Sequence, residues 1–317
     1  MPGRGPSPDQ VERFRGDLHA IAPAAAAARF GFAVSGGPDS LALLLLAHAA
    51  FAERIEVATV DHGLRKASAG EAALVADHCR HLGVRHSTLR PEAPIEGSVQ
   101  TAARAERYRL LEEWRSERGL DHVLTAHHAD DQAETLLMRL NRGAGVAGLS
   151  GVRAVNGALL RPLLGWRRSE LAAIVEEAGL AAVDDPSNAD ERFDRARLRA
   201  RLATADWVDP AGFARSAGAL AAAEAALEWT ADRLAEERLS ACGAAFQLQP
   251  DGLPAELRRR LLLRALRRLD AEAAPRGEEL SRLLATLEQG GTATLAGVKC
   301  LGGALWRFER APPRRSG

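Results

Sequence analysis

The segment Ser35-Gly36-Gly37-Pro38-Asp39-Ser40 contains the residue types that most clearly indicate chemistry in this sequence. It lies between an apolar stretch at 29–34 and an apolar run at 41–52, which predicts a strand, a tight turn and a buried helix. Two glycines let the backbone approach a ligand, and the amide groups that open the helix favour an anion, so the turn is predicted to bind phosphate. The carboxylate of Asp39 would repel phosphate unless it holds a bridging Mg²⁺ ion, and Asp39 is therefore the candidate metal ligand.

A second group of polar side chains follows a later predicted strand, at 122–126. His127 comes directly after this strand, and Asp130, Asp131 and Glu134 lie on the first turns of the helix predicted at 130–142. Ligands of parallel sheets bind at the carboxyl ends of the strands, so these side chains are expected beside the phosphate turn. Carboxylates there can hold Mg²⁺, receive an ammonium group or take a proton from an amine. The alternative is that the acids only stabilise the N-terminal end of the helix.

Two further groups are candidates for contacts with a nucleotide or a nucleic acid. Asp61 and His62 follow the predicted strand at 55–60 and are expected at the same sheet edge. Arginines recur in the predicted helices at 98–118 and 195–201, where they either reach phosphate or form a solvated surface. The arginines at alternate positions of the second helix cannot all face one side of it. The candidate arginines are Arg104, Arg107, Arg195, Arg197 and Arg199.

The elements that must position these residues alternate along the first half of the chain. Predicted strands at 29–34, 55–60, 85–89 and 122–126 are separated by predicted helices at 41–52, 68–82 and 98–118. This alternation predicts an α/β fold with a parallel sheet covered on both faces. Asn156-Gly157 predicts a hairpin, and the chain then reads as helices, with strand-like pieces near its end. The predicted divisions are a tail and helix at 1–24, a catalytic domain at 25–205 and a small, mainly helical domain at 206–317.

Composition excludes several classes of protein. The chain has 317 residues, with 42 basic and 42 acidic side chains and 46% hydrophobic residues, which is enough for a buried core. It has no apolar run long enough to span a membrane and no signal-peptide pattern, so a cytoplasmic protein without membrane contact is expected. The three cysteines, Cys79, Cys242 and Cys300, form no CxxC pair, which disfavours a disulfide framework or a zinc ribbon.

The charge is divided unevenly along the chain. Residues 192–317 hold 21 basic and 16 acidic side chains, a net charge of +5, so the rest of the chain carries −5. The second half is therefore expected to favour a polyanion, although an arginine-rich composition by itself could give the same count. Within it, Arg258-Arg259-Arg260 either grips a nucleic-acid backbone or is a solvated helix face.

Several strings of residues resemble one known family. The turn at 35–40 matches the SGGxDS loop of the PP-loop ATP pyrophosphatases. The strings that follow it in order are Val60-Asp61-His62-Gly63-Leu64-Arg65, Thr125-Ala126-His127-His128-Ala129-Asp130-Asp131-Gln132-Ala133-Glu134-Thr135, Arg142-Gly143-Ala144-Gly145-Val146-Ala147-Gly148-Leu149 and Arg161-Pro162-Leu163-Leu164. Together they resemble the tRNA(Ile)-lysidine synthetases over about 30–202.

The resemblance implies a fold, a reaction and a set of contacts. The fold would be the adenine nucleotide alpha hydrolase-like, Rossmann-like PP-loop fold. The reaction would be ATP-dependent ligation of free L-lysine to C2 of the wobble cytidine of a tRNA(Ile) with a CAU anticodon, through an adenylated intermediate, with Mg²⁺ as cofactor. The implied ATP contacts are Ser35, Gly36, Gly37, Pro38, Asp39, Ser40, Asp61 and His62. The implied catalytic residues are Asp39, His127, Asp130, Asp131 and Glu134, and the implied tRNA contacts are the five candidate arginines.

Departures from the family pattern leave alternatives open. Ala196 and Ala200 stand where the family has Asn and commonly His, so an amide-specific contact is not expected there. A tRNA thiolase of the same superfamily would need catalytic cysteines near the turn, and a non-catalytic nucleotide-binding module would not need the acidic helix. A homodimer is a further open alternative.

The segment Gly143 to Gly148 also fits the pattern GxGxxG. A dinucleotide site requires that pattern after a strand and at the start of a helix, whereas here it follows a predicted helix. The resemblance implies a flexible loop near the substrate entrance instead.

Overall fold

The computed structural model describes residues 4–23, 28–63, 68–93, 99–183, 194–202 and 204–312. The chain divides into two compact units, residues 1–221 and 222–317. This division falls within helix α9 (Pro210–Arg238), whereas the sequence analysis placed it at 205/206. Helix α1 (Pro8–Ile21) buries Val11, Phe14 and Leu18 in the core of the first unit.

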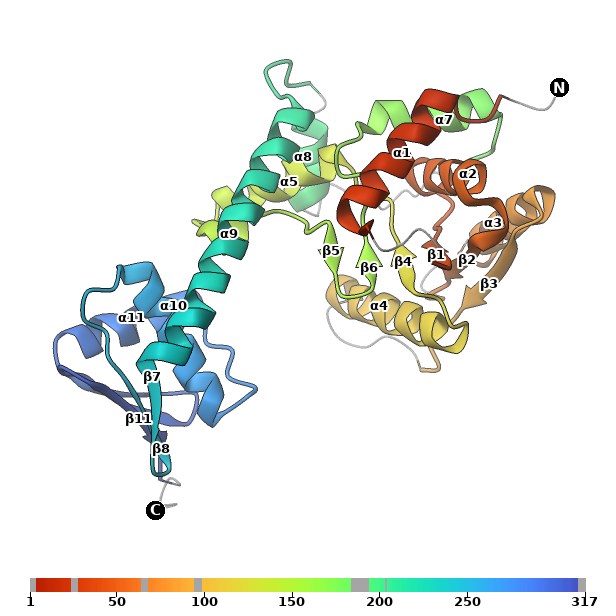
Figure 1. Cartoon of the computed structure of the whole chain (residues 1–317). Helices are drawn as coiled ribbons and strands as arrows, with labels where there is room; N and C mark the ends of the chain where they lie inside the picture. The colour runs from red at the N-terminus through yellow and green to blue at the C-terminus, as the bar shows by residue number, and fades with distance from the viewer. Residues whose placement is uncertain are drawn as a thin grey trace. The chain divides into compact units, whose positions relative to one another are not determined.

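The first unit is built on a six-stranded sheet (Figure 1). Its strand order is β3-β2-β1-β4-β6-β5, and each neighbouring pair is parallel except β5 with β6. The predicted parallel sheet is confirmed, as is the hairpin at Asn156-Gly157, where Gly157 takes a φ of +59°. The strands are β1 (Phe30–Ala33), β2 (Ile55–Val60), β3 (Arg85–Leu89), β4 (His122–Leu124), β5 (Val155–Asn156) and β6 (Leu159–Leu160).

Helices cover both faces of this sheet (Figure 1). Helix α2 (Pro38–Phe51) is apolar on all sides because it packs between the sheet and helices α1 and α7 (Arg168–Ala178). On the opposite face, Leu111 and Trp114 of α4 (Val99–Glu117) pack against Ala58 and Val123. The remaining helices are α3 (Ser68–Leu82), α5 (Ala129–Leu140), the short α6 (Val146–Leu149) and α8 (Asp194–Leu202).

The parallel strands end at one edge of the sheet, and this edge collects the predicted polar groups. The phosphate turn follows β1, Asp61 follows β2, and His127 follows β4. Two details of the sequence analysis lie outside the described residues, namely Ser98 as the start of the helix predicted at 98–118 and Leu64-Arg65 in the second string.

The second unit contains helices and a sheet. Helices α10 (Ala255–Leu269) and α11 (Gly277–Glu288) pack on an antiparallel sheet of order β7-β8-β11-β10-β9, around buried Trp306 and Phe308. The predicted helices are confirmed, and the strand-like pieces near the end of the chain belong to this five-stranded sheet, whereas its strands at 239–242 and 245–248 were not predicted. The strands are β7 (Leu239–Cys242), β8 (Ala245–Leu248), β9 (Thr292–Leu295), β10 (Val298–Leu301) and β11 (Trp306–Arg310).

The basic cluster of the second unit is paired with acids. Arg260 is 4% exposed, and its guanidinium contacts Glu224 and Glu228 of α9 and Glu256 of α10. Its neighbours Arg258 and Arg259 also form ion pairs, with Glu288 and Glu256. The interpretation of Arg260 as a surface residue is therefore wrong, because the α9 carboxylates that bury it lie more than 30 residues away in sequence. No helix in the described part of the chain is long and apolar enough to cross a membrane.

Candidate active site

The turn between β1 and α2 has the conformation for which glycine is suited. Gly36 has a φ of +89°, and its missing Cβ would lie 2.8 Å from Val183 Cγ2. Gly37 has an ordinary φ of −69°, and a Cβ there would meet only Ser35 Oγ, at 3.8 Å. Ser40 Oγ accepts a hydrogen bond from Ser35 N (3.1 Å) and donates one to Gly37 O (2.9 Å). The turn is thus closed at Gly36, braced by Ser40 and open beside Gly37.

His128 connects this turn to the acidic helix. Its buried ring lies among three carboxylates, with Nε2 at 3.4 Å from Asp39 Oδ2 and 3.6 Å from Asp131 Oδ2, and Nδ1 at 3.6 Å from Asp130 Oδ2. Burial alone would lower the pKa of His128, but the facing carboxylates of Asp130, Asp39 and Asp131 raise it to about 10. His128 therefore carries a proton at neutral pH and holds Asp39 beside α5.

Two arginines of α8 form ion pairs with carboxylates at the start of α5. Arg195 contacts Glu134 Oε2 through Nε (2.7 Å) and Asp131 Oδ1 through Nη2 (2.8 Å). Arg199 contacts Glu134 Oε1 through Nε (2.6 Å). Glu134 is 2% exposed, so its charge is matched by two guanidinium groups rather than by water. Asp131 is buried, but the charges of His128 and Arg195 lower its pKa, so it stays ionised.

His127 has the opposite protonation from His128. Burial lowers its pKa, and the charges of Arg161 and Arg104 act in the same direction against that of Asp131. Its Nδ1 lies 3.0 Å from Thr125 Oγ1. His127 is therefore neutral at pH 7, with a ring nitrogen that can accept a proton.

Asp61 and His62 line a separate small cavity of about 320 Å³, together with Arg90. A hydrogen bond with the Ser68 side chain lowers the pKa of Asp61, and the Gly63 amide (3.0 Å) and Arg90 Nε (3.1 Å) act in the same direction against burial. The two ring nitrogens of His62 are buried without a hydrogen-bond partner in the described part of the chain. A bound ligand could satisfy them.

The other predicted arginines form no ion pair with Asp131 or Glu134 in the described part of the chain. Arg104 and Arg107 are exposed on α4, where the Arg104 guanidinium lies 5.1 Å from the centroid of the Tyr108 ring. Arg197 turns away from the carboxylates of α5 and pairs with Asp194. The structure thus brings together Arg195 and Arg199, but not Arg197, with the acidic helix.

Two buried residues at the site were not among the predicted site residues. His128 was inside a quoted string, and its position directly before a helix was the available signal. Arg161 is 5% exposed and donates from Nη1 to Arg153 O (2.6 Å), while its Nε has no partner among the described residues. Its position after β6 could have indicated that it reaches the same sheet edge.

The segment that contains the GxGxxG pattern follows helix α5, as predicted. Arg139 donates to Gly148 O (2.6 Å) and Gly151 O (2.9 Å), while Gln132 Oε1 accepts from Val152 N (2.6 Å). Side chains of α5 therefore hold the end of this segment.

Asp39 offers one carboxylate to a Mg²⁺ ion, and further ligands would have to come from the substrate. Asp39 Oδ1 is buried without a hydrogen-bond partner among the described residues. Those residues contain no group of three or more His, Cys, Asp or Glu side chains placed to hold a metal ion. Because Mg²⁺ is commonly held by one or two carboxylates together with substrate phosphates, Asp39 fits an ion that ATP would bring with it.

Comparisons of sequence with known proteins indicate one family, and a solved structure shares the fold. A family model described as a PP-loop domain matches residues 10–205. A tRNA(Ile)-lysidine synthase of Novosphingobium aromaticivorans is 52% identical over 316 residues, covering 96% of this chain and 95% of that protein. A tRNA(Ile)-lysidine synthase of Zymomonas mobilis is 42% identical, covering 96% and 95%. Among solved structures, the U34-tRNA thiolase NcsA of Methanococcus maripaludis matches with a TM-score of 0.55 at 15% identity, covering 67% of this chain and 77% of that one.

Proposed function

The chain belongs to the tRNA(Ile)-lysidine synthase family, and from this premise we propose how its side chains divide the reaction. ATP first adenylates the C2 oxygen of the wobble cytidine of a tRNA(Ile) with a CAU anticodon, and pyrophosphate leaves. The ε-amine of free lysine then attacks C2, the bond from C2 to the adenylated oxygen breaks, and AMP departs. The product is lysidine.

The turn between β1 and α2 would bind the phosphates of ATP. The supporting observation is its shape, which is open beside Gly37 and lies at the N-terminal end of α2. Bound Mg²⁺, held by Asp39 and the phosphates, would offset the negative charge that develops on the leaving pyrophosphate. His128 would keep the Asp39 carboxylate in position.

The carboxylates around α5 would receive the lysine ammonium group. Asp130, Asp131 and Glu134 bring three carboxylates to this place, with His128, Arg195 and Arg199 beside them. The ammonium group would donate to these carboxylate oxygens, and a charge-assisted hydrogen bond of this kind contributes roughly 1.5–3 kcal/mol. Neutral His127 would accept the proton that the amine must lose before it attacks.

The observation that carries this proposal is the contact of His128 with both Asp39 and Asp131, which links the phosphate turn to the acidic helix. The cysteines argue against a thiolase. Cys79 is the only cysteine of residues 1–221, and it is buried, with a pKa raised by burial to about 12. Such a thiol is a poor nucleophile.

The test is a single-turnover reaction with labelled ATP, unmodified tRNA(Ile) and lysine. We expect pyrophosphate release that requires the tRNA, and AMP release that also requires lysine. Binding of ATP without tRNA-dependent pyrophosphate release would indicate a non-catalytic module instead.

The variant Asp131→Asn tests the division of roles. Loss of one charged contact should raise the lysine requirement by about 10- to 150-fold, with a smaller change in ATP affinity. The adenylated tRNA should then accumulate, because activation precedes attack. If the variant loses ATP binding and keeps its lysine dependence, the carboxylates of α5 serve Mg²⁺ and not lysine.

A further inference from the structure

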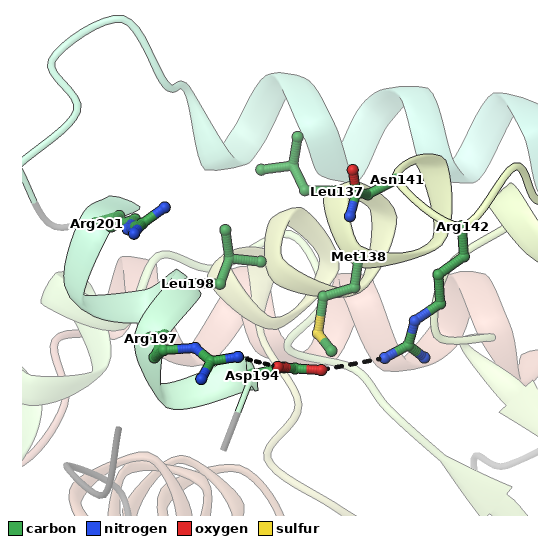
Figure 2. Close-up of a pocket in the computed structure, with 8 residues that line it drawn as sticks. All are labelled: Leu137, Met138, Asn141, Arg142, Asp194, Arg197, Leu198 and Arg201. Atoms are coloured by element: carbon green, nitrogen blue, oxygen red, sulfur yellow. Dashed lines mark hydrogen bonds and ion pairs between the residues drawn. The ribbon is translucent and has the colours of Figure 1, made fainter. Parts of the chain in front are cut away.

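A cavity of about 620 Å³ lies between α5 and α8 and plays no part in the chemistry proposed above (Figure 2). Such a volume is within the range of roughly 300–1,000 Å³ that holds small ligands. Half-buried Leu137, Met138 and Leu198 form its apolar part. The polar side chains that line it are Asn141, Arg142, Asp194, Arg197 and Arg201.

The charges of this cavity are predominantly positive. Three guanidinium groups face one carboxylate, and Figure 2 shows Asp194 between Arg197 and Arg142, both of which pair with it. Arg201 has no ion-pair partner among the described residues. A ligand with one negative group and a flat apolar body would match this lining, since guanidinium groups bind phosphate and the thioether of Met packs well against aromatic rings.

Helix α8 has two arginine faces, and this explains the alternation seen in its sequence. Arg195 and Arg199 are four residues apart and contact the carboxylates of α5, whereas Arg197 and Arg201 are four apart and line the cavity. On α5, Met138 is one turn beyond Glu134, a rise of about 6 Å along the helix axis. The cavity is therefore about one nucleotide away from the carboxylates.

We infer that this cavity binds a single unstacked nucleotide of the substrate RNA, next to the cytidine that reacts. Its base would lie against Met138 and Leu198, and its phosphate would contact Arg201 and Arg197. Single-stranded RNA loops are recognised in this way, with bases splayed out of the stack. This inference rests on the proposed function, which supplies the RNA and the reacting cytidine.

The experiment measures binding of full-length tRNA(Ile) in the absence of ATP and lysine, so it does not depend on turnover. The tRNA carries an abasic nucleotide on one side or the other of the wobble cytidine. For the unaltered protein, one of the two abasic positions should weaken binding by roughly 5- to 150-fold, the range given by contacts to one base. In the variants Met138→Ala and Leu198→Ala, the same abasic nucleotide should weaken tRNA binding by less than about 2-fold, because the contact with the base is already lost.

A second pair of variants tests the phosphate contact without disturbing the apolar surface. Arg201→Gln should weaken tRNA binding and make the log–log salt slope less steep by about 0.7 for one phosphate. The matched control is Arg80→Gln on α3, which removes another exposed charge, one that pairs with Asp77, and should leave the slope unchanged. Equal slopes for the Arg201 and Arg80 variants would overturn the phosphate contact.

The remaining outcomes separate this inference from the proposed function. If abasic tRNA loses the same affinity for the Met138 and Leu198 variants as for the unaltered protein, the cavity does not hold a base. A second result would also overturn the inference: free CMP or AMP binds saturably to the unaltered protein and not to these variants, but the abasic nucleotide weakens tRNA binding equally in all of them. The dependence of the abasic effect on Met138 and Leu198 is called the coupling below. If the coupling is present but no lysidine forms, the inference stands and the proposed function fails. If the unaltered protein binds no tRNA, both fail.

Discussion

Asp39 is the residue whose negative charge is expected to matter most for the reaction. One carboxylate oxygen faces protonated His128 and the other is buried without a partner in the described part of the chain. Asp39→Asn keeps the shape and removes the charge, so we expect a folded protein whose tRNA-dependent pyrophosphate release falls by about 100-fold or more. Pyrophosphate release under single-turnover conditions measures this, and a thermal melt checks the fold.

The control for this variant is Asp77→Asn on α3, an exposed aspartate that pairs with Arg80. It should leave pyrophosphate release unchanged. Near-normal release by a folded Asp39→Asn protein would remove Asp39 from the proposed mechanism.

His128 gives a pH dependence whose direction can be worked out. Its pKa is about 10 in the folded protein, against about 6.5 in an unfolded chain. The folded state therefore binds the proton more tightly, so the stabilisation is fully present below pH 6.5 and is lost as the pH rises towards 10. Compared with His128→Asn, the unaltered protein should lose a relative free energy of unfolding of about 3–5 kcal/mol over this range.

Urea unfolding of both proteins at several pH values between 6.5 and 10 measures this difference. Asp39, Asp130 and Asp131 face His128. The pKa values of Asp130 and Asp131 are lowered by His128, so both stay ionised throughout, and His127 titrates below this range because its pKa is lowered by burial. A difference that does not change with pH would mean that His128 is neutral in the folded protein.

At the scale of the element, two adjacent glycines of the turn between β1 and α2 have different roles. Gly36 is required for the fold, whereas Gly37 is expected to matter for ATP binding. Gly36→Ala forces a side chain into a φ of +89° and into contact with Val183, so stability should fall by about 1–2 kcal/mol or more. Gly37→Ala adds a methyl group in an ordinary conformation with open space around it, so the fold should tolerate it. That methyl group should nevertheless weaken ATP binding, because it occupies the open side of the turn.

Thermal melts and ATP titrations of the two variants measure these effects. Gly37→Ala with unaltered ATP affinity would show that the phosphates approach the turn from elsewhere. Loss of stability in Gly37→Ala comparable to that in Gly36→Ala would contradict the described geometry.

At the scale of the whole molecule, the two units place their arginines differently. In the first, Arg197 and Arg201 line a cavity, whereas in the second Arg260 is buried between acids of α9 and α10. Arg260→Ala would leave Glu224 buried without its partner, so the second unit should lose about 3–5 kcal/mol of stability. Arg233→Ala, in an exposed pair with Glu236, should change it by less than about 0.5 kcal/mol.

Chemical denaturation of the whole chain, followed by tryptophan fluorescence to which the buried Trp306 contributes, checks this prediction. Equal stability of the two variants would show that the Arg260 cluster contributes nothing to the fold.

The sequence of neighbouring residues was sufficient to predict the strands of the parallel sheet in the first unit and the sheet edge at which the polar side chains gather. Periodicity and glycine placed β2 and β3 at their observed bounds, and strands followed by polar residues predicted which side chains would gather where the parallel strands end. These are properties of neighbouring residues, and the sequence contains them directly. The resemblance in the quoted strings was enough to indicate the family.

Tertiary structure alone decided which charges meet. Nothing near Glu134 in the sequence shows that Arg195 and Arg199 cover it from 61 and 65 residues away, or that three carboxylates keep a proton on His128 while its neighbour His127 stays neutral. The same holds for Arg260, a surface arginine by pattern and a buried one in the fold. Protonation and ion pairing depend on burial and on distances of a few ångströms between elements, and packing sets both.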